Sequence, residues 1–211
     1  QLLQRAEARA RAQLAAEDLP AFTIHGAIEA ENTAAQALFD SLGYITTRHF
    51  WRMELSMDAP PPAPEWPAGI LVRAFRLEDE RAVHATVQEA FRDHWGSLPT
   101  PFDEWRQAAI GREDFDPALW FLAYDQDELA GVVLGYPRTA ELGWVRNLSV
   151  RRPWRRRGLG LALLVQVFGA FYTRGLRTGG LGVDAKKPTG GTRLYERAGM
   201  VVAERYAHKE K

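Results

Sequence analysis

The chain has 211 residues, 46% hydrophobic and 26% charged, which is enough to bury a core in one large domain or two modest ones. Its 27 basic and 27 acidic residues give a formal net charge of zero, which argues against a general binder of nucleic acids or membrane surfaces. It has no cysteine, and this excludes disulfides, thiolate nucleophiles and cysteine-bound metals.

The first 57 residues have a helix–strand–helix–strand pattern, and the chain opens directly into the first helix at Gln1. We therefore expect that part of the protein upstream is missing. The expected elements are a helix over residues 2–18, a strand over 22–29, a helix over 32–42 and a long strand over 44–57.

A proline-rich segment follows at Asp58–Pro67, with five prolines in ten residues. Proline cannot continue a helix or a central strand and favours an extended polyproline conformation. The pattern predicts a linker over residues 58–69 that separates an N-terminal lobe (1–57) from a C-terminal domain (70–211).

The region after the linker begins with a strand and continues with alternating strands and helices, which is typical of a mixed α/β sheet. An apolar stripe of helical spacing is expected on the helix after Gly158, formed by Leu161, Leu164, Val165, Phe168 and Tyr172. The expected strands are 70–75, 119–124, 129–136, 143–150, 181–184 and 200–206, and the expected helices are 78–94, about 102–110, 158–174 and 192–198.

The sequence contains an internal repeat. Leu38–Tyr44 (LFDSLGY) matches Leu194–Met200 (LYERAGM) at a constant offset of 156, and the same order of elements surrounds both copies. A seven-residue match can arise by chance, but the shared element order favours duplication. The N-terminal copy then lacks its first half.

One turn carries a pattern suited to anion binding. Arg155–Gly160 (RRRGLG) lies between an apolar strand and an apolar helix, and the N-terminus of a helix offers unpaired N–H groups and a partial positive charge. Two glycines would allow a pyrophosphate to approach the backbone, and five arginines lie within Arg151–Arg157. The alternative is a solvated basic loop. Neither a Walker loop nor a dinucleotide-binding glycine pattern fits this segment.

This turn, with its preceding strand and following helix, resembles the acyl-CoA pyrophosphate loop of the GCN5-related N-acetyltransferases (GNAT), and Leu194–Met200 resembles the family's C-terminal motif. The resemblance covers roughly residues 70–211 and implies the GNAT fold, with one complete domain and the C-terminal half of a second. Tandem pairs of this kind are similar to mycothiol synthase and related acetyltransferases.

The resemblance implies an acyl-CoA site formed by three backbone positions, Leu148, Ser149 and Val150, and by the turn residues Arg155, Arg156, Arg157, Gly158, Leu159 and Gly160. The Leu148 N–H would also stabilise the oxyanion that forms at the thioester carbonyl. The alternative is that the strand around Leu148 is simply a buried core strand.

Tyr195 is implied as the general acid that protonates the departing CoA thiolate, with a core aromatic as the alternative. The matching residue of the N-terminal copy is Phe39, which has no proton to donate, so that copy is expected to be inert. An asparagine that commonly precedes this helix is present at Asn32 but absent from 186–189 (KKPT), which puts one CoA contact in doubt.

The general base is less determined. Glu141 is the first candidate, Asp184 the second, and a chain of waters the third. For the acceptor, an aromatic and acidic region would suit a cationic amine, or would simply pack a loop against the linker or the N-terminal lobe. Its residues are Trp95, Phe102, Asp103, Trp105 and Trp120.

The sequence thus predicts a cytoplasmic, acetyl-CoA-dependent N-acetyltransferase that acts by direct attack of a small-molecule primary amine, without a metal. Its oligomeric state, monomer or homodimer, stays open. The alternatives are acylation of a cysteinyl amine, as in mycothiol synthase, and a non-catalytic acyl-CoA sensor. Nucleic-acid binding through Arg151–Arg157 is disfavoured by the zero net charge, and no apolar run is long enough to cross a bilayer.

Overall fold

The structure is a computed structural model that describes residues 2–16, 23–92, 94–185 and 191–211. The chain folds into two compact units. The larger unit contains residues 52–183 and 188–203, and the smaller contains residues 1–51, 184–187 and 204–211. Within the described ranges, no helix combines the length and apolar character needed to cross a membrane.

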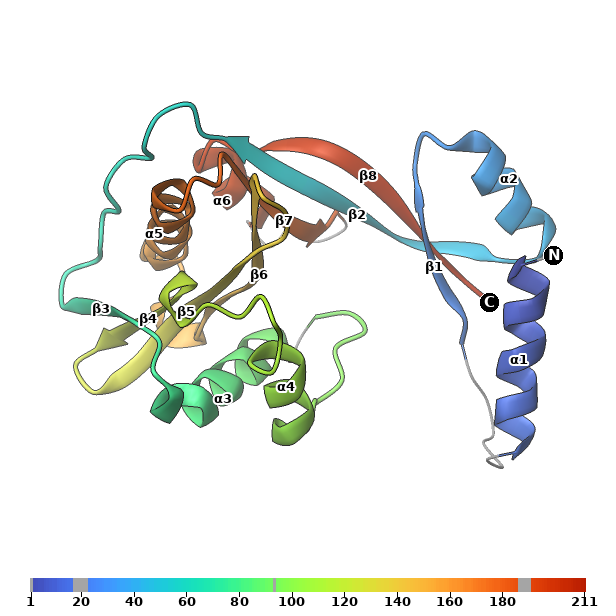
Figure 1. Cartoon of the computed structure of the whole chain (residues 1–211), viewed down its shortest axis with the longest axis horizontal. Helices are drawn as coiled ribbons and strands as arrows, with labels where there is room; N and C mark the ends of the chain where they lie inside the picture. The colour runs from blue at the N-terminus through green and yellow to red at the C-terminus, as the bar shows by residue number, and fades with distance from the viewer. Residues whose placement is uncertain (1, 17–22, 93, 186–190) are drawn as a thin grey trace. The chain divides into compact units, whose positions relative to one another are not determined.

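The larger unit is built on a mixed sheet, as predicted (Figure 1). Strands β3, β4, β5 and β6 pair antiparallel in turn, whereas β6 and β7 are parallel. Eight strands form the hydrogen-bonded order β1-β8-β2-β7-β6-β5-β4-β3. The strands that begin and end in this region are β3 (Ile70–Ala74), β4 (Trp120–Asp125), β5 (Glu128–Pro137), β6 (Leu142–Val150) and β7 (Thr178–Asp184).

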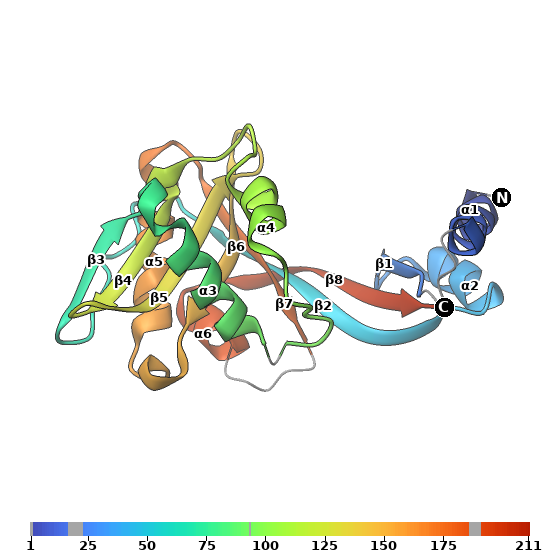
Figure 2. The same cartoon turned by 90° about the horizontal axis from the view of Figure 1, so that it is seen from below.

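Two helices cover each face of this sheet, with α3 and α4 on one side and α5 and α6 on the other (Figures 1 and 2). Their bounds match the predicted helices within a few residues. They are α3 (Glu80–Phe91), α4 (Phe102–Ala109), α5 (Leu159–Thr173) and α6 (Gly191–Arg197), with 3-10 turns at Leu77–Asp79, Pro117–Leu119 and Arg152–Trp154.

Helix α5 packs unusually close to the sheet because glycines lie beneath its aromatic residues. A Cβ atom at Gly143 would lie 2.4 Å from the Phe171 ring, and one at Gly179 would lie 2.6 Å from the Phe168 ring. The predicted apolar stripe was partly wrong, because the helix is apolar nearly all round and periodicity could not select the buried face. The buried residues are Leu159, Ala162, Leu163, Leu164, Val167, Phe168 and Phe171.

Replacing Gly143 by alanine should therefore lower the free energy of unfolding by about 1–3 kcal/mol, because the new methyl group overlaps the Phe171 ring. Gly169→Ala is the matched control on α5, where nothing lies within 4 Å of the added Cβ. It should raise stability by about 0.5–1 kcal/mol through helix propensity. Urea denaturation measures both, and equal stability of the two variants would contradict this packing.

A buried carboxylate ties the start of α3 to the sheet. Asp79 accepts two hydrogen bonds from the Arg73 guanidinium at 2.6 Å and one from the Arg76 backbone N–H at 2.8 Å. The Arg73 partner is the main cause that holds the pKa of Asp79 below its ordinary value, against the opposing effect of burial. This arrangement fixes the chain direction at the start of the helix.

Asp79→Asn should lower the free energy of unfolding at pH 7 by about 2 kcal/mol, because charge-assisted hydrogen bonds are lost. The pKa of Asp79 is lower in the folded protein than its ordinary value near 3.8. The greater stability of the wild type is therefore fully present above pH 3.8, and it is lost as the pH falls through the pKa of the folded state. Urea unfolding between pH 7 and pH 3 should show the two proteins converging only at the acid end. A gap that stays constant with pH would contradict this assignment.

The smaller unit contains α1 (Leu2–Ala16), β1 (His25–Glu29) and α2 (Thr33–Ser41), and two long strands, β2 (Ile45–Ser56) and β8 (Val201–Glu210), contribute to both units. Within it, β1 pairs antiparallel with β8, so that His25 faces Glu210. The unit boundaries therefore differ from the predicted break at the proline-rich segment. A strand's sequence pattern does not reveal its partner, and pairing assigns residues 204–211 to the smaller unit.

The two repeat copies share one helix C-terminus in detail. Gly43 and Gly199 both have φ of 84°, a left-handed conformation that favours glycine. In each copy, the N–H of the residue after the glycine bonds to the carbonyl five residues earlier, at 3.0 Å, in Tyr44–Phe39 and Met200–Tyr195. The matching strands of the two copies are β1 with β7 and β2 with β8. When each is exchanged for its match, the series β1-β8-β2-β7 becomes the same series read from its other end. These features support the predicted duplication.

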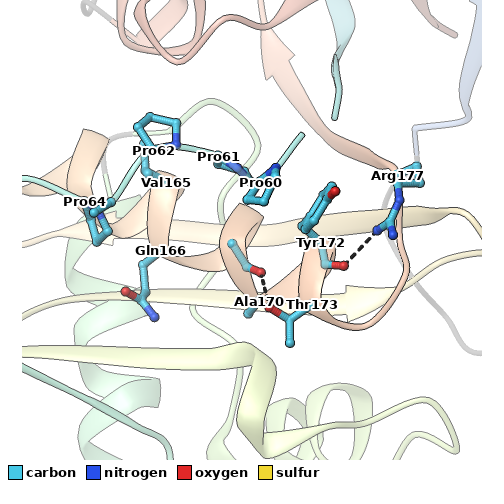
Figure 3. Close-up of a pocket in the computed structure, with 12 residues that line it drawn as sticks. Pro60, Pro61, Pro62, Pro64, Val165, Gln166, Ala170, Tyr172, Thr173 and Arg177 are labelled. Carbon is cyan, nitrogen blue, oxygen red and sulfur yellow. Dashed lines mark hydrogen bonds between the residues drawn. The ribbon is translucent and has the colours of Figure 1, made fainter. Parts of the chain in front are cut away.

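The proline-rich segment runs along α5 (Figure 3). Pro60–Pro64 line a cavity of about 640 Å³ together with Gln166, Tyr172 and Arg177. The Arg177 guanidinium donates to the Tyr172 carbonyl at 2.8 Å and lies over the Tyr172 ring. The segment is therefore a packed part of the larger unit as well as a connection.

Candidate active site

Strands β6 and β7 pair only at their first residues. The parallel register joins Leu142, Gly143 and Trp144 to Thr178, Gly179 and Gly180, and ends there. On the other side of β6, the register with β5 shifts, because Leu134 pairs with Asn147 and Gly135 pairs with Val145. Arg146 is therefore an extra residue in β6 and forms a β-bulge. The Trp144 ring packs against the Gly180 backbone at the last paired position, where an added Cβ would lie 2.9 Å from it. Beyond this point, no pairing with β7 continues along the edge of β6 among the described residues.

The alternation of the β5–β6 ladder indicates which backbone groups face that edge. The Arg151 N–H bonds to the Ala130 carbonyl of β5, so Ser149, two residues earlier, also points toward β5. Leu148 and Val150 point the other way, and the Val150 carbonyl accepts a hydrogen bond from the Arg155 side chain at 3.0 Å. Leu148 and the Val150 N–H thus fit the predicted role of backbone partners, whereas the Val150 carbonyl is bonded to Arg155 and the Ser149 backbone faces β5.

The end of β6 leads into the predicted phosphate turn, where Gly158 begins α5 with φ of 87°. The Leu161 and Ala162 N–H groups both bond to the Gly158 carbonyl. In the described part of the chain, no side chain caps this terminus, and its first turn holds no acidic residue. The N–H groups of Gly158, Leu159 and Gly160 therefore form an uncapped, partially positive helix end.

The arginines of the turn have different surroundings. Arg155 is used within the protein, donating to the Val150 carbonyl and, at 3.5 Å, to the Ala90 carbonyl. Arg151 bonds Glu89 at 2.8 Å and the Leu129 carbonyl at 3.2 Å. Arg156 and Arg157 have exposed side chains, and Arg157 lies 4.0 Å from Asp125. All three arginines predicted to hold phosphate are thus exposed, and Arg155 also braces the turn.

Gly160 joins the turn to the repeat motif. A Cβ atom at Gly160 would lie 2.9 Å from Leu194 of α6, so the glycine allows α6 to approach the start of α5. Tyr195 follows Leu194 directly. Burial raises the pKa of the Tyr195 phenol above its ordinary value, so it is protonated at neutral pH. The position before α6, at 186–189, lies outside the described residues.

The two carboxylates predicted as general bases lie at strand ends, Glu141 just before β6 and Asp184 at the last residue of β7. Glu141 is exposed, and the seven residue steps from Glu141 to Leu148 along β6 span roughly 20 Å. Asp184 belongs to the smaller unit, where its carboxylate lies 3.9 Å from Arg48. Glu141 therefore stays a prediction that the strand geometry disfavours.

Two of the three tryptophans predicted for the acceptor region belong to the core. Trp105 and Trp120 are 5% and 3% exposed, and their rings are 6.2 Å apart. The Trp120 Nε1 donates to the Gly135 carbonyl at 3.1 Å. These two side chains therefore pack on each other and on neighbouring aromatic rings. Trp95 and Asp103 remain exposed.

Sequence reasoning missed the residues around the bulge. The Arg146 Nη1 donates to the Ala108 carbonyl at 2.9 Å, and its pKa is lowered by burial and by the neighbouring charge of Arg112. Arg112 forms a two-bond ion pair with Asp114 and lies over the Tyr136 ring. The only sequence signal for these residues was Arg146, the one charged residue in the predicted strand 143–150.

A cavity of about 500 Å³ lies beside the phosphate turn. It is lined by Gly158, Leu161 and Ala162 of α5, by Arg197 of α6 and by residues of the proline-rich segment. This size is in the range of small-molecule sites. The Arg197 side chain and the apolar residues Leu161 and Ala162 therefore line a cavity next to the uncapped N-terminus of α5.

Comparison with known proteins shows the family of this chain. The model of the Acetyltransferase (GNAT) family matches residues 81–200. The chain belongs to the GNAT acetyltransferase family. The family resemblance, the mixed α/β fold and the enzyme class expected from the sequence are thereby confirmed.

Relatives of this GNAT acetyltransferase include a mycothiol acetyltransferase of Streptomyces scabiei (strain 87.22), 37% identical over 82% of this chain and 56% of the relative. A GCN5-related N-acetyltransferase from Sphaerobacter thermophilus has a similar structure, with a TM-score of 0.79 and 43% identity over 90% of this chain and 59% of that one. A tandem GNAT protein from the clavulanic acid biosynthesis pathway shares the fold, with a TM-score of 0.71 at 15% identity over 96% of this chain and 67% of that one. The chain thus spans less than two thirds of the length of the first two proteins.

Proposed function

We propose that this GNAT acetyltransferase transfers the acetyl group of acetyl-CoA to the primary amine of a small molecule by direct attack. The observation that carries the proposal is the junction of β6, the turn and α5. An unpaired strand edge with Leu148 and Val150 leads there directly into an uncapped helix end. An extended pantetheine arm with a pyrophosphate at one end matches this order of groups.

In the proposed complex, the pyrophosphate contacts the N–H groups at the start of α5, with Arg156 and Arg157 adding positive charge from the solvent side. The pantetheine amides pair with the free edge of β6. The cavity beside Gly158 accommodates the remaining nucleotide part, with Arg197 as its cation. The thioester then lies near Leu148.

The chemical step forms a C–N bond and breaks the C–S bond. The neutral amine attacks the thioester carbonyl carbon, and the Leu148 N–H stabilises the oxyanion of the tetrahedral intermediate. The intermediate collapses as the CoA sulfur leaves with the bonding electrons and takes a proton from Tyr195, whose raised pKa keeps it protonated. The excess proton of the amine passes to water, or to Glu141 if that residue is the base.

Thermal unfolding with acetyl-CoA tests the first part. Acetyl-CoA at 100 times its Kd should stabilise the folded state by about 2.7 kcal/mol, whereas adenosine alone should give a much smaller effect. A panel of amines assayed for release of free CoA thiol tests the second part. An unchanged melting temperature at saturating acetyl-CoA would refute the proposal. Stabilisation without turnover on any amine would favour an acyl-CoA sensor.

A second candidate is acetylation of a cysteinyl amine, because curated relatives at 30–37% identity bear the name mycothiol acetyltransferase. The same panel separates the two when it includes cysteinyl glucosamine-inositol beside simple alkylamines. A preference of more than about 100-fold in kcat/KM for the cysteinyl substrate would select this candidate. Equal rates would leave the general amine acetyltransferase.

A further inference from the structure

Three metal-binding side chains meet on one face of the smaller unit, away from the phosphate turn in sequence. They are His25 on β1 and His208 and Glu210 on β8, and their ligand atoms all lie within 4.8 Å of one another. The strand register explains this meeting. His25 is directly opposite Glu210, and His208 is two residues before Glu210 on the same side of its strand.

The face is set by the alternation of β8. Lys209, between the two cluster residues of β8, is 2% exposed and forms an ion pair with Asp40 of α2. His208 and Glu210 therefore point to the opposite face, away from α2. Their side chains are 17% and 20% exposed, while that of His25 is 52% exposed. Two of the three ligands are thus largely buried, and His25 is accessible to solvent.

The distances suit a small divalent ion. One carboxylate oxygen of Glu210 lies 3.5 Å from the His25 Nδ1 and 3.6 Å from the His208 Nδ1. Tetrahedral zinc with bonds of about 2.0–2.1 Å requires its ligand atoms to be about 3.3–3.5 Å apart. The surroundings are polar, since the Thr47 hydroxyl is 3.4 Å from the His208 Nδ1.

The other repeat copy shows that the strand arrangement does not require this cluster. At the offset of 156, the residues matching His25, His208 and Glu210 are Leu181, Arg52 and Glu54. Arg52 and Glu54 form an ion pair there. At the matching positions, one copy therefore has an Arg–Glu ion pair, and the other has two histidines beside a glutamate.

We propose that His25, His208 and Glu210 form a zinc site that joins β1 to β8, with water as the fourth ligand. Two imidazoles and a carboxylate are a ligand set that zinc accepts. Because the ion bridges the N-terminal segment and the last strand, it stabilises this pairing. The site is independent of the acyl-transfer site proposed above and needs no acetyl-CoA.

Zinc titration of the tag-free full chain against a chromophoric chelator tests the site. The wild type should bind one Zn²⁺ with a Kd of about 1 µM or tighter, and His25→Gln and His208→Gln should each weaken binding at least about 10-fold. His49→Gln, at an exposed histidine of the same unit that is outside the cluster, should bind like the wild type. Co²⁺ should give the intense visible absorption of a low-coordinate site in the wild type and in His49→Gln only.

A metal-free melting curve for each variant distinguishes loss of the site from loss of the fold. Zinc should raise the melting temperature of the wild type and of His49→Gln, and leave that of folded His25→Gln and His208→Gln unchanged. Binding weaker than about 100 µM in the wild type would overturn the proposal. Binding that persists in both cluster variants would overturn it as well, and so would binding lost equally in His49→Gln.

Discussion

Replacing Tyr195 by phenylalanine should lower kcat about 10²–10⁴-fold while leaving the Kd for acetyl-CoA nearly unchanged. The phenol provides the proton for the departing thiolate, and phenylalanine keeps the ring that α6 packs but removes the proton. Because burial raises the pKa of Tyr195, the wild-type rate should fall only at pH values above the ordinary value of 10.0. Steady-state kinetics with thiol detection and calorimetric titration of acetyl-CoA measure the two quantities.

Tyr172→Phe on α5 is the matched control, since it removes a phenol from the same unit beside the proline-rich segment. It should retain at least about half of the wild-type kcat. A Tyr195→Phe variant with full activity would show that the leaving thiolate takes its proton from solvent. A Tyr195→Phe variant that loses acetyl-CoA binding would assign the residue to the binding site instead.

Replacing Arg156 and Arg157 together by alanine should raise the Kd for acetyl-CoA about 10- to 100-fold, because two charged groups near the pyrophosphate are lost. Unfolding stability should stay within about 0.5 kcal/mol of the wild type, since both side chains are exposed. Arg155→Ala should instead lower stability by about 1–2 kcal/mol, because its guanidinium bonds the Val150 and Ala90 carbonyls. Calorimetry and urea denaturation give these values.

Arg9→Ala serves as a charge control, because Arg9 is an exposed arginine of α1 in the smaller unit. It should leave the acetyl-CoA affinity unchanged at 150 mM salt, because Arg9 is no part of the proposed site and exposed charges are screened beyond about 8 Å. If Arg9→Ala weakens binding as much as the double variant, the arginines act only through net charge. If neither variant weakens binding, the turn is a solvated basic loop.

Several parts of this enzyme followed from local sequence patterns. Period-2 and period-3.6 alternation predicted the strands and helices to within a few residues, because each period depends on residues close in the chain. The strand–turn–helix around Gly158 was predictable for the same reason, since its glycine and arginines are neighbours. The match between Leu38–Tyr44 and Leu194–Met200 predicted that the two helix ends would have the same conformation, and both end on a glycine with φ of 84°.

Other features needed the fold, because they depend on which strands and helices meet. The apolar surface of α5 extends nearly all round, and only the glycines of the sheet decide that Phe168 and Phe171 face inward. Trp105 and Trp120 had two possible roles in the sequence, and their contact with each other assigns both to the core. The distance of Glu141 from Leu148 likewise follows from the direction of β6.

The sequence alone thus determined the family, and it predicted the turn suited to phosphate and the role of Tyr195, because each of these signals lies in a short continuous segment. Only the tertiary structure decided that β6 separates from β7 after Trp144, since a parallel register joins residues far apart in the chain. It also decided that residues 204–211 belong with the N-terminal segment, and that His25 meets His208 and Glu210. Strand pairing depends on hydrogen bonds between distant backbones, which carry no local signal in the sequence.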